Sequence, residues 1–351
     1  MQLQASTVQD HPRAKRTHTP SVTVVCCIES GVLEPTTCRM VESLRRFGGR
    51  FSKAPVVAVT PRAGPPLQRV TRRKMEELGI EHLHIRPAHP YLWHHYVNKA
   101  HAIRSVEERV RSEIITWVDG DIIFLREPNE LDLADGEGFV ACAPDLGMLG
   151  SRGTTDPYDP FWERCAQLVG LRIDDLPWLT TGDGHRVRFY WNAGLYSYRR
   201  DTGFGREFLA DFERALDSKV SRNHLQVHAM DQVMLGLTVL RLGLGWRAIP
   251  DTSNFPVLSW LPHNFDPEKV RDVDILHYHD SMQPHLWPKL LATLKPYHPE
   301  VHAWLEPLGP VHETSSPFAR ALREGLRVYR GLYRRAYYAR CGFTKGSKAV
   351  K

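Results

Sequence analysis

The sequence predicts an α/β fold in which a mainly parallel sheet carries helices on both of its faces. Short apolar runs rich in Val and Ile alternate with amphipathic segments through the first half of the chain, as in successive βαβ units. Hydrophobic residues make up 42% and charged residues 25% of the sequence, which is the balance of a soluble globular protein. No apolar run approaches the roughly 20 residues that span a bilayer. A chain of 351 residues therefore forms one large domain or two ordinary ones.

The first half of the chain gives the clearest alternation of strands and helices. Residues 22–28 form a continuous apolar run, as expected of a strand that is buried on both faces. In the first predicted helix, Met40 and Leu44 recur at helical spacing, and Gly79 ends the second helix. The predicted strands cover residues 22–28, 54–59, 81–85 and 113–118, and the predicted helices cover 34–47, 67–78 and 96–111.

The second half of the chain is less regular. Residues 144–190 are rich in Asp, Pro and Gly and predict long loops around one helix. Loops of this length in a compact domain tend to be functional. The predicted strands are 138–143, 195–198 and 275–279, and the predicted helices are 161–169, 205–216, 230–242, 286–294 and 299–305.

The six cysteines and the N-terminal segment indicate in which compartment we expect the protein. The cysteines are scattered and form no C-x-x-C pair, so we expect reduced thiols rather than disulfides or a zinc site. Residues 1–20 are polar, have no apolar signal-like core, and predict a flexible arm before a folded body over 21–312. These features favour a cytoplasmic protein.

The C-terminal tail, residues 313–351, carries the positive charge of the chain. From Phe318 onward there are seven Arg and three Lys against one Glu, a net charge of +9, which leaves −3 for the rest. A body near neutrality argues against a nucleic-acid-binding enzyme. The tail predicts a helix with one apolar and aromatic stripe, formed by Phe318, Leu322, Leu326, Tyr329, Tyr333 and Tyr337. In one interpretation this helix binds the anionic inner surface of a membrane. In the other it packs on the body of the protein, and its arginines are exposed to solvent.

The segment TWVDGDIIFLREP places two carboxylates directly after a predicted buried strand. Asp119 and Asp121 are separated only by Gly120, and a second apolar run follows. Ligands of parallel α/β sheets collect at the carboxyl ends of the strands. Two carboxylates there suit a hard divalent cation such as Mg²⁺ or Mn²⁺, which also accepts phosphate oxygens. The alternative is a plain Asp-Gly hairpin turn.

Three segments that follow Asp119-Gly120-Asp121 in the chain contain further motifs. They are YWNAGLYSY at 190–198, HAMDQVML at 228–235 and LHYHDSMQPHLW at 276–287. With Asp119-Gly120-Asp121, this ordered set resembles the nucleotide-sugar-dependent glycosyltransferases of the GT-A fold, which have a mainly parallel Rossmann-like sheet. It is most similar to the retaining family-8 group, which includes glycogenin and bacterial lipopolysaccharide galactosyl- and glucosyltransferases.

The resemblance implies a metal site and a sugar pocket. Asp119 and Asp121 match the metal-binding pair, and Asp119 would also face the ribose. His277 matches the third metal ligand. Asn192 and Gly194 match the strand that lines the sugar and acceptor pocket. The implied cofactor is Mn²⁺ or Mg²⁺.

The resemblance also implies contacts to the donor. Asp231 and Gln232 match the pair that holds the donor sugar near its anomeric carbon, and with Asn192 they are the expected catalytic residues. Glu29 and Ser30 stand where such folds bind the nucleoside. Lys99 falls where related enzymes place a basic donor contact.

The late motif departs from the family pattern. Where the family has His, two residues, Gly, two residues and Lys-Pro-Trp, this chain has Asp280 for Gly and Gln283 for Lys. Gln283 therefore stands where a lysine would neutralise the diphosphate. The sequence leaves several substitutes open, namely His279, His285, Lys289 or an arginine such as Arg152. For an inverting reaction the candidate bases are Asp183, Asp231 and Asp280.

The expected function is metal-dependent transfer of a hexose from a UDP- or GDP-sugar to a hydroxyl group of a glycan or lipid-linked acceptor. A metal would stabilise the negative charge of the leaving phosphate, and a carboxylate or amide would stabilise the positive charge of the oxocarbenium-like sugar. Retention is implied by the resemblance alone. One alternative is a non-catalytic sugar-nucleotide-binding scaffold. A second is a nucleotidyltransferase, which the segment ESGVLEPTT after the first strand disfavours because it lacks a Gly-rich basic loop.

Overall fold

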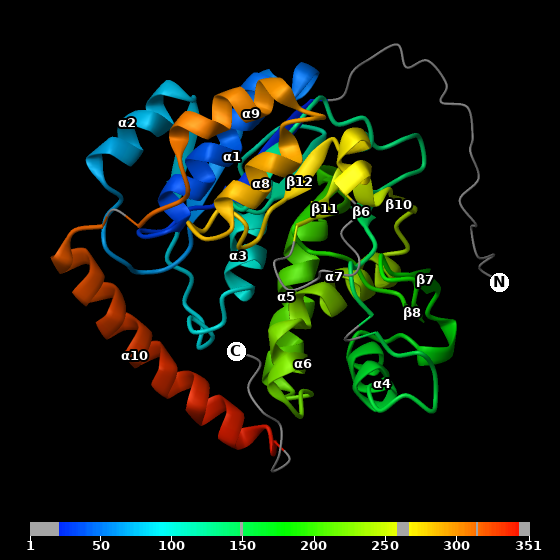
Figure 1. The fold of residues 1–351 in the computed structure, drawn as a ribbon. Helices are drawn as coiled ribbons and strands as arrows, with labels where there is room; N and C mark the ends of the chain where they lie inside the picture. Colours follow the sequence, from blue (N-terminus) through cyan, green and yellow to red (C-terminus); the bar gives the residue numbers. More distant parts are fainter. Residues whose placement is uncertain (1–20, 148–149, 258–266, 314, 344–351) are drawn as a thin grey trace.

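The computed structural model describes residues 21–147, 150–257, 267–313 and 315–343 (Figure 1). The predicted arm at 1–20 lies outside the described residues. A seven-stranded sheet has the order β10-β6-β9-β4-β1-β2-β3, and β9 alone runs antiparallel to its neighbours. The predicted α/β class with a mainly parallel sheet is therefore confirmed. The strands of this sheet are β1 (Val22–Cys27), β2 (Val56–Thr60), β3 (Ile80–His84), β4 (Ile114–Val118), β6 (Phe139–Cys142), β9 (Leu195–Arg199) and β10 (Trp246–Ile249).

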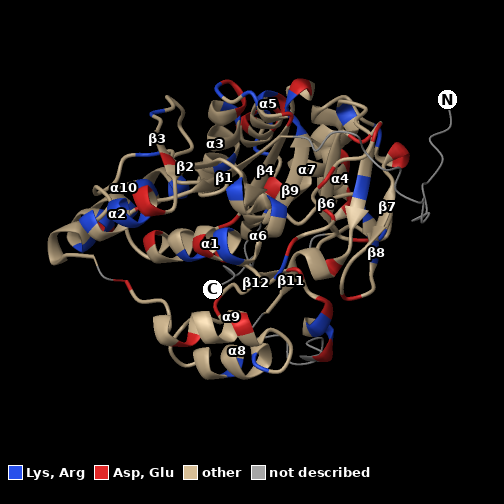
Figure 2. Ribbon diagram, turned by 90° about the horizontal axis from the view of Figure 1, so that it is seen from above, with Lys and Arg blue, Asp and Glu red and all other residues tan. Residues whose placement is uncertain are grey.

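Helices cover both faces of the sheet, as Figure 2 shows in the view from above. Side chains alternate between the faces along β1, where Val25 packs on one side and Val24 and Cys26 on the other. One face packs against α3 (Val97–Glu107), α4 (Asp159–Leu168), α5 (Phe204–Asp217) and α7 (Met230–Arg241). The other face packs against α1 (Leu33–Phe47) and α2 (Arg69–Glu77). A short helix, α6 (His224–His228), precedes α7.

A second, three-stranded sheet builds a separate core beside the first. It has the order β11-β12-β5, with bounds β5 (Ile122–Phe124), β11 (Phe255–Pro256) and β12 (Ile275–His277). It packs against α8 (Trp287–Leu294) and α9 (Pro299–Leu305). Strand β5 follows β4 after the Asp119-Gly120-Asp121 turn, so this turn joins the two sheets.

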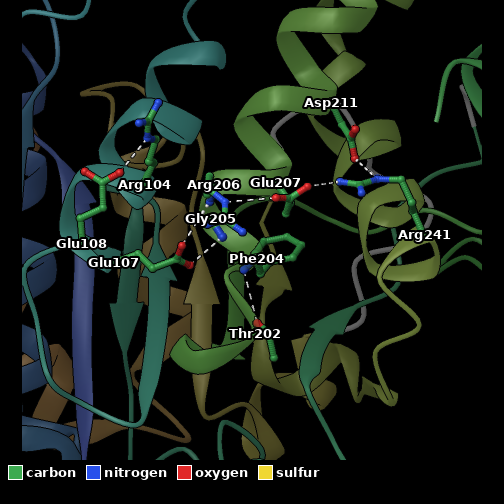
Figure 3. A network of polar contacts seen from close by, with 10 residues as sticks. All are labelled: Arg104, Glu107, Glu108, Thr202, Phe204, Gly205, Arg206, Glu207, Asp211 and Arg241. Carbon is green, nitrogen blue, oxygen red and sulfur yellow. Dashed lines mark hydrogen bonds and ion pairs between the residues drawn. The ribbon is translucent and has the colours of Figure 1, made fainter.

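A polar network holds α3, α5 and α7 in register (Figure 3). The carboxylate of Glu107 accepts hydrogen bonds from the backbone N–H groups of Gly205 (2.7 Å) and Arg206 (3.2 Å), which caps the first turn of α5. From α7, Arg241 donates to Glu207 (2.9 Å) and to the fully buried Asp211 (2.8 Å) on α5. These contacts fix α7, whose first turn carries Asp231.

The structure differs from the sequence-based assignment mainly in the second half. Residues 144–190, expected to be loops around one helix, also contain a hairpin of β7 (Trp178–Thr180) and β8 (Arg186–Arg188). Strand β10, α6 and β11 were not predicted. The helix expected over 96–111 ends at Glu107, and the strand expected over 275–279 ends at His277. Strand β10 pairs with β6, which is far away in the chain, and β7, β8, β11 and α6 have only two to five residues, so local patterns do not reveal these elements.

All six cysteines are free thiols, as predicted. Burial raises the pKa of Cys38 to about 12, so its thiol stays protonated near neutral pH. No disulfide contributes to the fold within the described residues.

The C-terminal tail forms one long helix, α10 (Pro317–Arg340), along one side of the molecule (Figure 1). The hydroxyl of Ser316 caps its first turn by accepting from the N–H of Ala319. Its last turn is anchored to the body, where the buried Tyr337 donates to the carbonyl of Leu216 and packs on Trp93. Within the described residues, no helix combines the length and the apolar composition that crossing a membrane requires.

Candidate active site

The Asp-Gly-Asp turn lies at the carboxyl end of β4, in the centre of the large sheet. The N–H of Asp119 donates to the carbonyl of Gly194 (2.8 Å), which ties the turn to the segment before β9. Gly120 lies against the start of α1, because a Cβ atom there would be 3.1 Å from the Thr37 hydroxyl. The predicted pair of carboxylates thus stands at the sheet edge where α/β proteins bind ligands.

Strand pairing brings His277 to the same place. Strand β12 runs antiparallel to β5, and His277 stands opposite Ile122, the residue after Asp121. Nε2 of His277 lies 3.3 Å from Oδ1 of Asp121. One ligand atom from each of Asp119, Asp121 and His277 fits within 4.8 Å of the other two, so the three predicted ligands converge.

The charges of this triad are interdependent. Partial burial acts to raise the pKa of Asp121, but the neighbouring imidazole of His277 outweighs it, and the pKa lies below its usual range. Burial acts to lower the pKa of His277, and Asp121 reverses this, so the pKa of His277 is raised. Burial raises the pKa of Asp119, an effect that Lys99 opposes. A bound cation would compensate the negative charge of Asp119 and Asp121, which His277 and Lys99 compensate in the structure.

The triad fits a divalent metal in its chemistry. Two carboxylates and one imidazole are suitable donors for Mn²⁺, and the carboxylates also suit Mg²⁺. Nδ1 of His277 is buried and has no hydrogen-bond partner among the described residues. The ring is therefore held by packing and by Asp121 rather than by a saturated hydrogen-bond network.

Lys99 joins the triad to the first turn of α7. Its ammonium group lies 2.7 Å from Oδ2 of Asp119 and 4.0 Å from a carboxylate oxygen of Asp231. Oδ1 of Asp119 accepts from the indole N–H of Trp117 (2.9 Å). Burial raises the pKa of Asp231 to about 6, although Lys99 and the backbone N–H of Gln232 oppose the shift. The predicted residues Lys99, Asp119 and Asp231 therefore form one charged group.

Both ends of the Asn192 amide form hydrogen bonds within the protein. Its carbonyl oxygen accepts from the N–H of Gly194 (2.8 Å), and its amide donates to Asp145 (3.1 Å). Sequence reasoning missed Asp145, whose pKa burial raises to about 6 despite the nearby His277. Asp145 closely follows β6, which is parallel to β4, so its position after a strand end was the signal that could have identified it.

Glu29 and Ser30 line a cavity beside the triad rather than joining it. The cavity has a volume of about 210 Å³ and lies where β1 and β2 end. Arg62, which follows β2, holds the carboxylate of Glu29 through Nε (2.7 Å) and Nη2 (2.8 Å). Arg62 was not expected from the sequence.

The substitutes for the missing lysine fall in different places. The ring of His279 stacks on that of His277 with centroids 3.8 Å apart. Gln283, His285 and Lys289 are exposed around the start of α8. Arg152 lines a separate cavity with Trp178. His279 is thus the candidate that contacts the triad.

The three candidate bases for an inverting reaction lie in different surroundings. Asp231 lies in the charged group with Lys99, whereas Asp183 accepts from the N–H of Gly147 and from the hydroxyl of Thr181 within its own loop. Asp280 is half-buried and follows His279 in the turn after β12.

Three solved structures resemble this chain in their fold. Mouse xyloside xylosyltransferase 1, in its apo form, aligns at a TM-score of 0.43 and 13% identity, over 74% of this chain and 97% of its own. The galactosyltransferase LgtC, in complex with donor and acceptor sugar analogues, aligns at 0.46 and 16%, over 75% and 88%. The bifunctional glycosyltransferase WbbM aligns at 0.46 and 9%, over 83% and 53%. No curated protein sequence matches this chain.

A sequence comparison defines the class of the protein. Residues 24–243 match the sequence model of a glycosyltransferase domain, so the protein is a glycosyltransferase, as predicted. The family is described as the Rhodobacterales glycosyltransferase domain, the match covers more than half of the chain, and the protein belongs to this family. The matched residues include Asp119, Asp121, Asn192 and Asp231, whereas His277 and the whole of α10 lie beyond them.

Proposed function

We propose that this glycosyltransferase moves a hexose from a UDP- or GDP-sugar to a hydroxyl group of a glycan or lipid-linked acceptor, with Mn²⁺ or Mg²⁺ at Asp119, Asp121 and His277. The observation that carries the proposal is the convergence of these three side chains within 4.8 Å at the carboxyl edge of the sheet. A divalent cation bound there would offset the negative charge of the leaving diphosphate. The sequence resemblance to family 8 supports retention of the anomeric configuration.

Besides the metal ligands, four residues have proposed roles in binding the donor and in stabilising charge. Lys99 holds Asp119 in place and partly neutralises the pocket. Asp231, buried at the start of α7, presents a carboxylate that would stabilise positive charge on the donor sugar. Asn192 acts as a positioning residue, because both ends of its amide are bound to Gly194 and Asp145. Gln232, half-buried beside Asp231, is the second proposed sugar contact.

The test is metal-dependent turnover of the donor. The full chain is incubated with a panel of UDP- and GDP-sugars in Mn²⁺ or in EDTA, and both hydrolysis and transfer are followed. We expect turnover in Mn²⁺ only, and a loss of at least roughly tenfold in Asp121→Ala, as for other disrupted metal sites. The matched control is Asp201→Asn, which changes an exposed carboxylate outside the site.

Other outcomes would support different functions. Turnover that is unaffected by EDTA and by Asp121→Ala would refute the metal site. Binding of UDP or GDP without any turnover would support the scaffold alternative. Release of pyrophosphate from a nucleoside triphosphate and a sugar phosphate would support a nucleotidyltransferase. The anomeric configuration of the first product, read by NMR, would test retention.

We also propose that α10 docks this enzyme on an anionic membrane. Four of the six residues of the predicted apolar stripe are exposed, namely Phe318 (76%), Leu322, Tyr329 and Tyr333. Leu332, which was not part of the predicted stripe but lies on the same side of the helix as Phe318, is 57% exposed. Exposed arginines such as Arg320 and Arg340 belong to the same helix. An apolar face next to cationic side chains is the composition of helices that lie in an anionic membrane surface. Packing on the body involves the other side of α10, through the buried Tyr337 and through arginines such as Arg323 and Arg330.

Flotation with lipid vesicles tests this docking. Phosphatidylcholine vesicles with phosphatidylglycerol should carry the protein, and vesicles without it should carry much less. Leu332→Ser with Phe318→Ser should abolish flotation, whereas Leu308→Ser, an exposed leucine outside α10, should not. Equal flotation of both variants would refute the docking surface.

A further inference from the structure

The body-facing side of α10 is as distinctive as its apolar outer side. The cavity beside the triad is bounded on one side by Glu29, Ser30 and Arg62, and on the other by arginines of α10. The α10 arginines that line it are Arg323, Arg327, Arg330 and Arg334. Figure 2 shows the basic residues distributed along this helix. A C-terminal segment outside the family-matched region thus forms one wall of the cavity.

The cavity gathers more positive than negative charge. Arg62 is paired with Glu29, Arg323 with Glu313 and Arg327 with Glu324. Arg330 donates to the carbonyl of Ala63, and neither Arg330 nor Arg334 pairs with a carboxylate among the described residues.

Arg330 is the more confined of the two unpaired arginines. Burial lowers the pKa of the half-buried Arg330, and the like charge of Arg62 lowers it further, although the nearby Glu29 opposes the shift. Arg330 and Arg334 lie one turn apart on α10 and line the same cavity. Two neighbouring guanidinium groups that have no carboxylate partner are a site for an anion, because an anion offsets their charge. Guanidinium groups also match the geometry of phosphate oxygens.

The cavity and the triad share one edge of the sheet. Glu29 follows β1, Arg62 follows β2 and Asp119 follows β4, and these three strands are parallel neighbours in the order β4-β1-β2. Neighbouring strands lie about 4.8 Å apart, so the cavity begins one strand away from the triad. Arg323 lies over Gly31, where a Cβ atom would be 3.2 Å from its Cζ. A ligand of nucleotide size can therefore reach both places.

We propose that α10 is part of the donor site, and that Arg330 and Arg334 bind a phosphate group of the nucleoside diphosphate. The inference rests on the proposed function for the identity of the ligand, but not for the presence of an anion site. It assigns to arginines from the C-terminal helix the diphosphate contact that Gln283 cannot supply. Arg323, which also contacts Ser30 (3.5 Å), lines the same cavity.

Calorimetry on the full chain tests the assignment. The probes are UDP, GDP, uridine, guanosine and inorganic pyrophosphate, each with and without Mn²⁺. In Arg330→Gln/Arg334→Gln we expect the affinity for UDP or GDP to fall at least roughly tenfold, while nucleoside affinity stays the same. Arg335→Gln, which removes an exposed arginine that does not line the cavity, is the matched control. The contribution of the two arginines should shrink at high salt, since it is electrostatic.

Helix docking has to be separated from phosphate binding, because Arg330 also holds Ala63. Arg334→Gln alone leaves that contact intact and should still weaken diphosphate binding at an unchanged thermal midpoint. Arg330→Lys, which keeps the charge, should bind better than Arg330→Gln. Equal weakening of nucleoside and nucleotide binding would overturn the proposal, and so would wild-type affinity of the double variant for UDP and GDP.

Failure of the proposed function would look different. If the wild type binds no nucleotide but binds pyrophosphate, and the double variant does not, the anion site stands and the sugar-nucleotide donor is refuted. If the wild type binds neither nucleotides nor pyrophosphate, the anion site is refuted. In EDTA, Asp121→Ala should keep its Arg330-dependent pyrophosphate binding, which separates this site from the metal.

Discussion

The imidazole of His277 occupies the space that any side chain on residue 194 would need. A Cβ atom on Gly194 would lie 2.5 Å from Cε1 and 3.0 Å from Nδ1 of His277. The missing side chain lets β12 approach the segment before β9, so that His277 reaches Asp121. The glycine of the Asn-Ala-Gly motif thus acts on the site through the position of a residue in the other sheet.

Gly194→Ala should therefore displace His277 and weaken metal binding. We expect a loss of about 10- to 100-fold in Mn²⁺ affinity and in turnover, the range seen when the support of a metal ligand is removed. Electron paramagnetic resonance of Mn²⁺ titrations measures the affinity directly. Gly325→Ala, where nothing lies within 4 Å of the new Cβ atom, is the control. Wild-type Mn²⁺ affinity in Gly194→Ala would contradict the role given to this glycine.

Lys99→Met should destabilise the protein as well as inactivate it. The largely buried ammonium group is the cation between Asp119 and Asp231, and its loss leaves two facing carboxylates without compensation. Breaking such a pair costs about 3 kcal/mol in the free energy of unfolding. Urea denaturation measures it, with Lys53→Met, an exposed lysine, as the control. A stability equal to wild type would show that Lys99 is not needed to balance these carboxylates.

Acid should destabilise the protein partly through His94. Burial lowers the pKa of His94 from the ordinary 6.5 to about 4, and its ring hydrogen-bonds the carbonyl of Val227 (2.9 Å). Between these values the unfolded chain binds a proton on His94 that the folded chain does not. The free energy of unfolding therefore falls as the pH drops from 6.5 to 4, by up to about 3 kcal/mol.

His94→Gln isolates this contribution, because glutamine can still donate to Val227 and does not titrate. We expect the difference in stability between wild type and variant to shrink as the pH falls through that window. Chemical denaturation at several pH values measures it. A difference that is constant with pH would contradict the low pKa of His94.

Asp211→Asn should loosen the contact between α5 and α7 that Figure 3 displays. Asp211 is fully buried and accepts from Arg241 (2.8 Å), Arg214 (2.7 Å) and the hydroxyl of Thr238 (3.0 Å). Removing its charge weakens hydrogen bonds that involve ionised partners, at a cost of about 2 kcal/mol in the free energy of unfolding. The exposed Asp201→Asn should change stability little. Similar thermal midpoints for the two variants would contradict the prediction.

Local pattern determined much of the fold and half of the site. Buried strands such as β1 and β4 are continuous apolar runs, and the Asp119-Gly120-Asp121 turn interrupts one of them, so both could be placed from neighbouring residues alone. The α/β class followed from the alternation of such runs with helices. Strand β10 was missed because its partner β6 lies far away in the chain, and the hairpin β7-β8 was missed because each of its strands has only three residues.

The sequence by itself determined the chemical inventory: the carboxylate pair after β4, the acid at the start of α7 and the apolar stripe of the C-terminal helix. Tertiary structure alone decided which of these groups meet. The pairing of β12 with β5 brings His277 to Asp121, and the end of β6 adds Asp145. The docking of Tyr337 turns the arginines of α10 toward the cavity and most of its apolar stripe away from the body. Periodicity fixes which residues share a face, but the packing of the whole chain decides what that face meets.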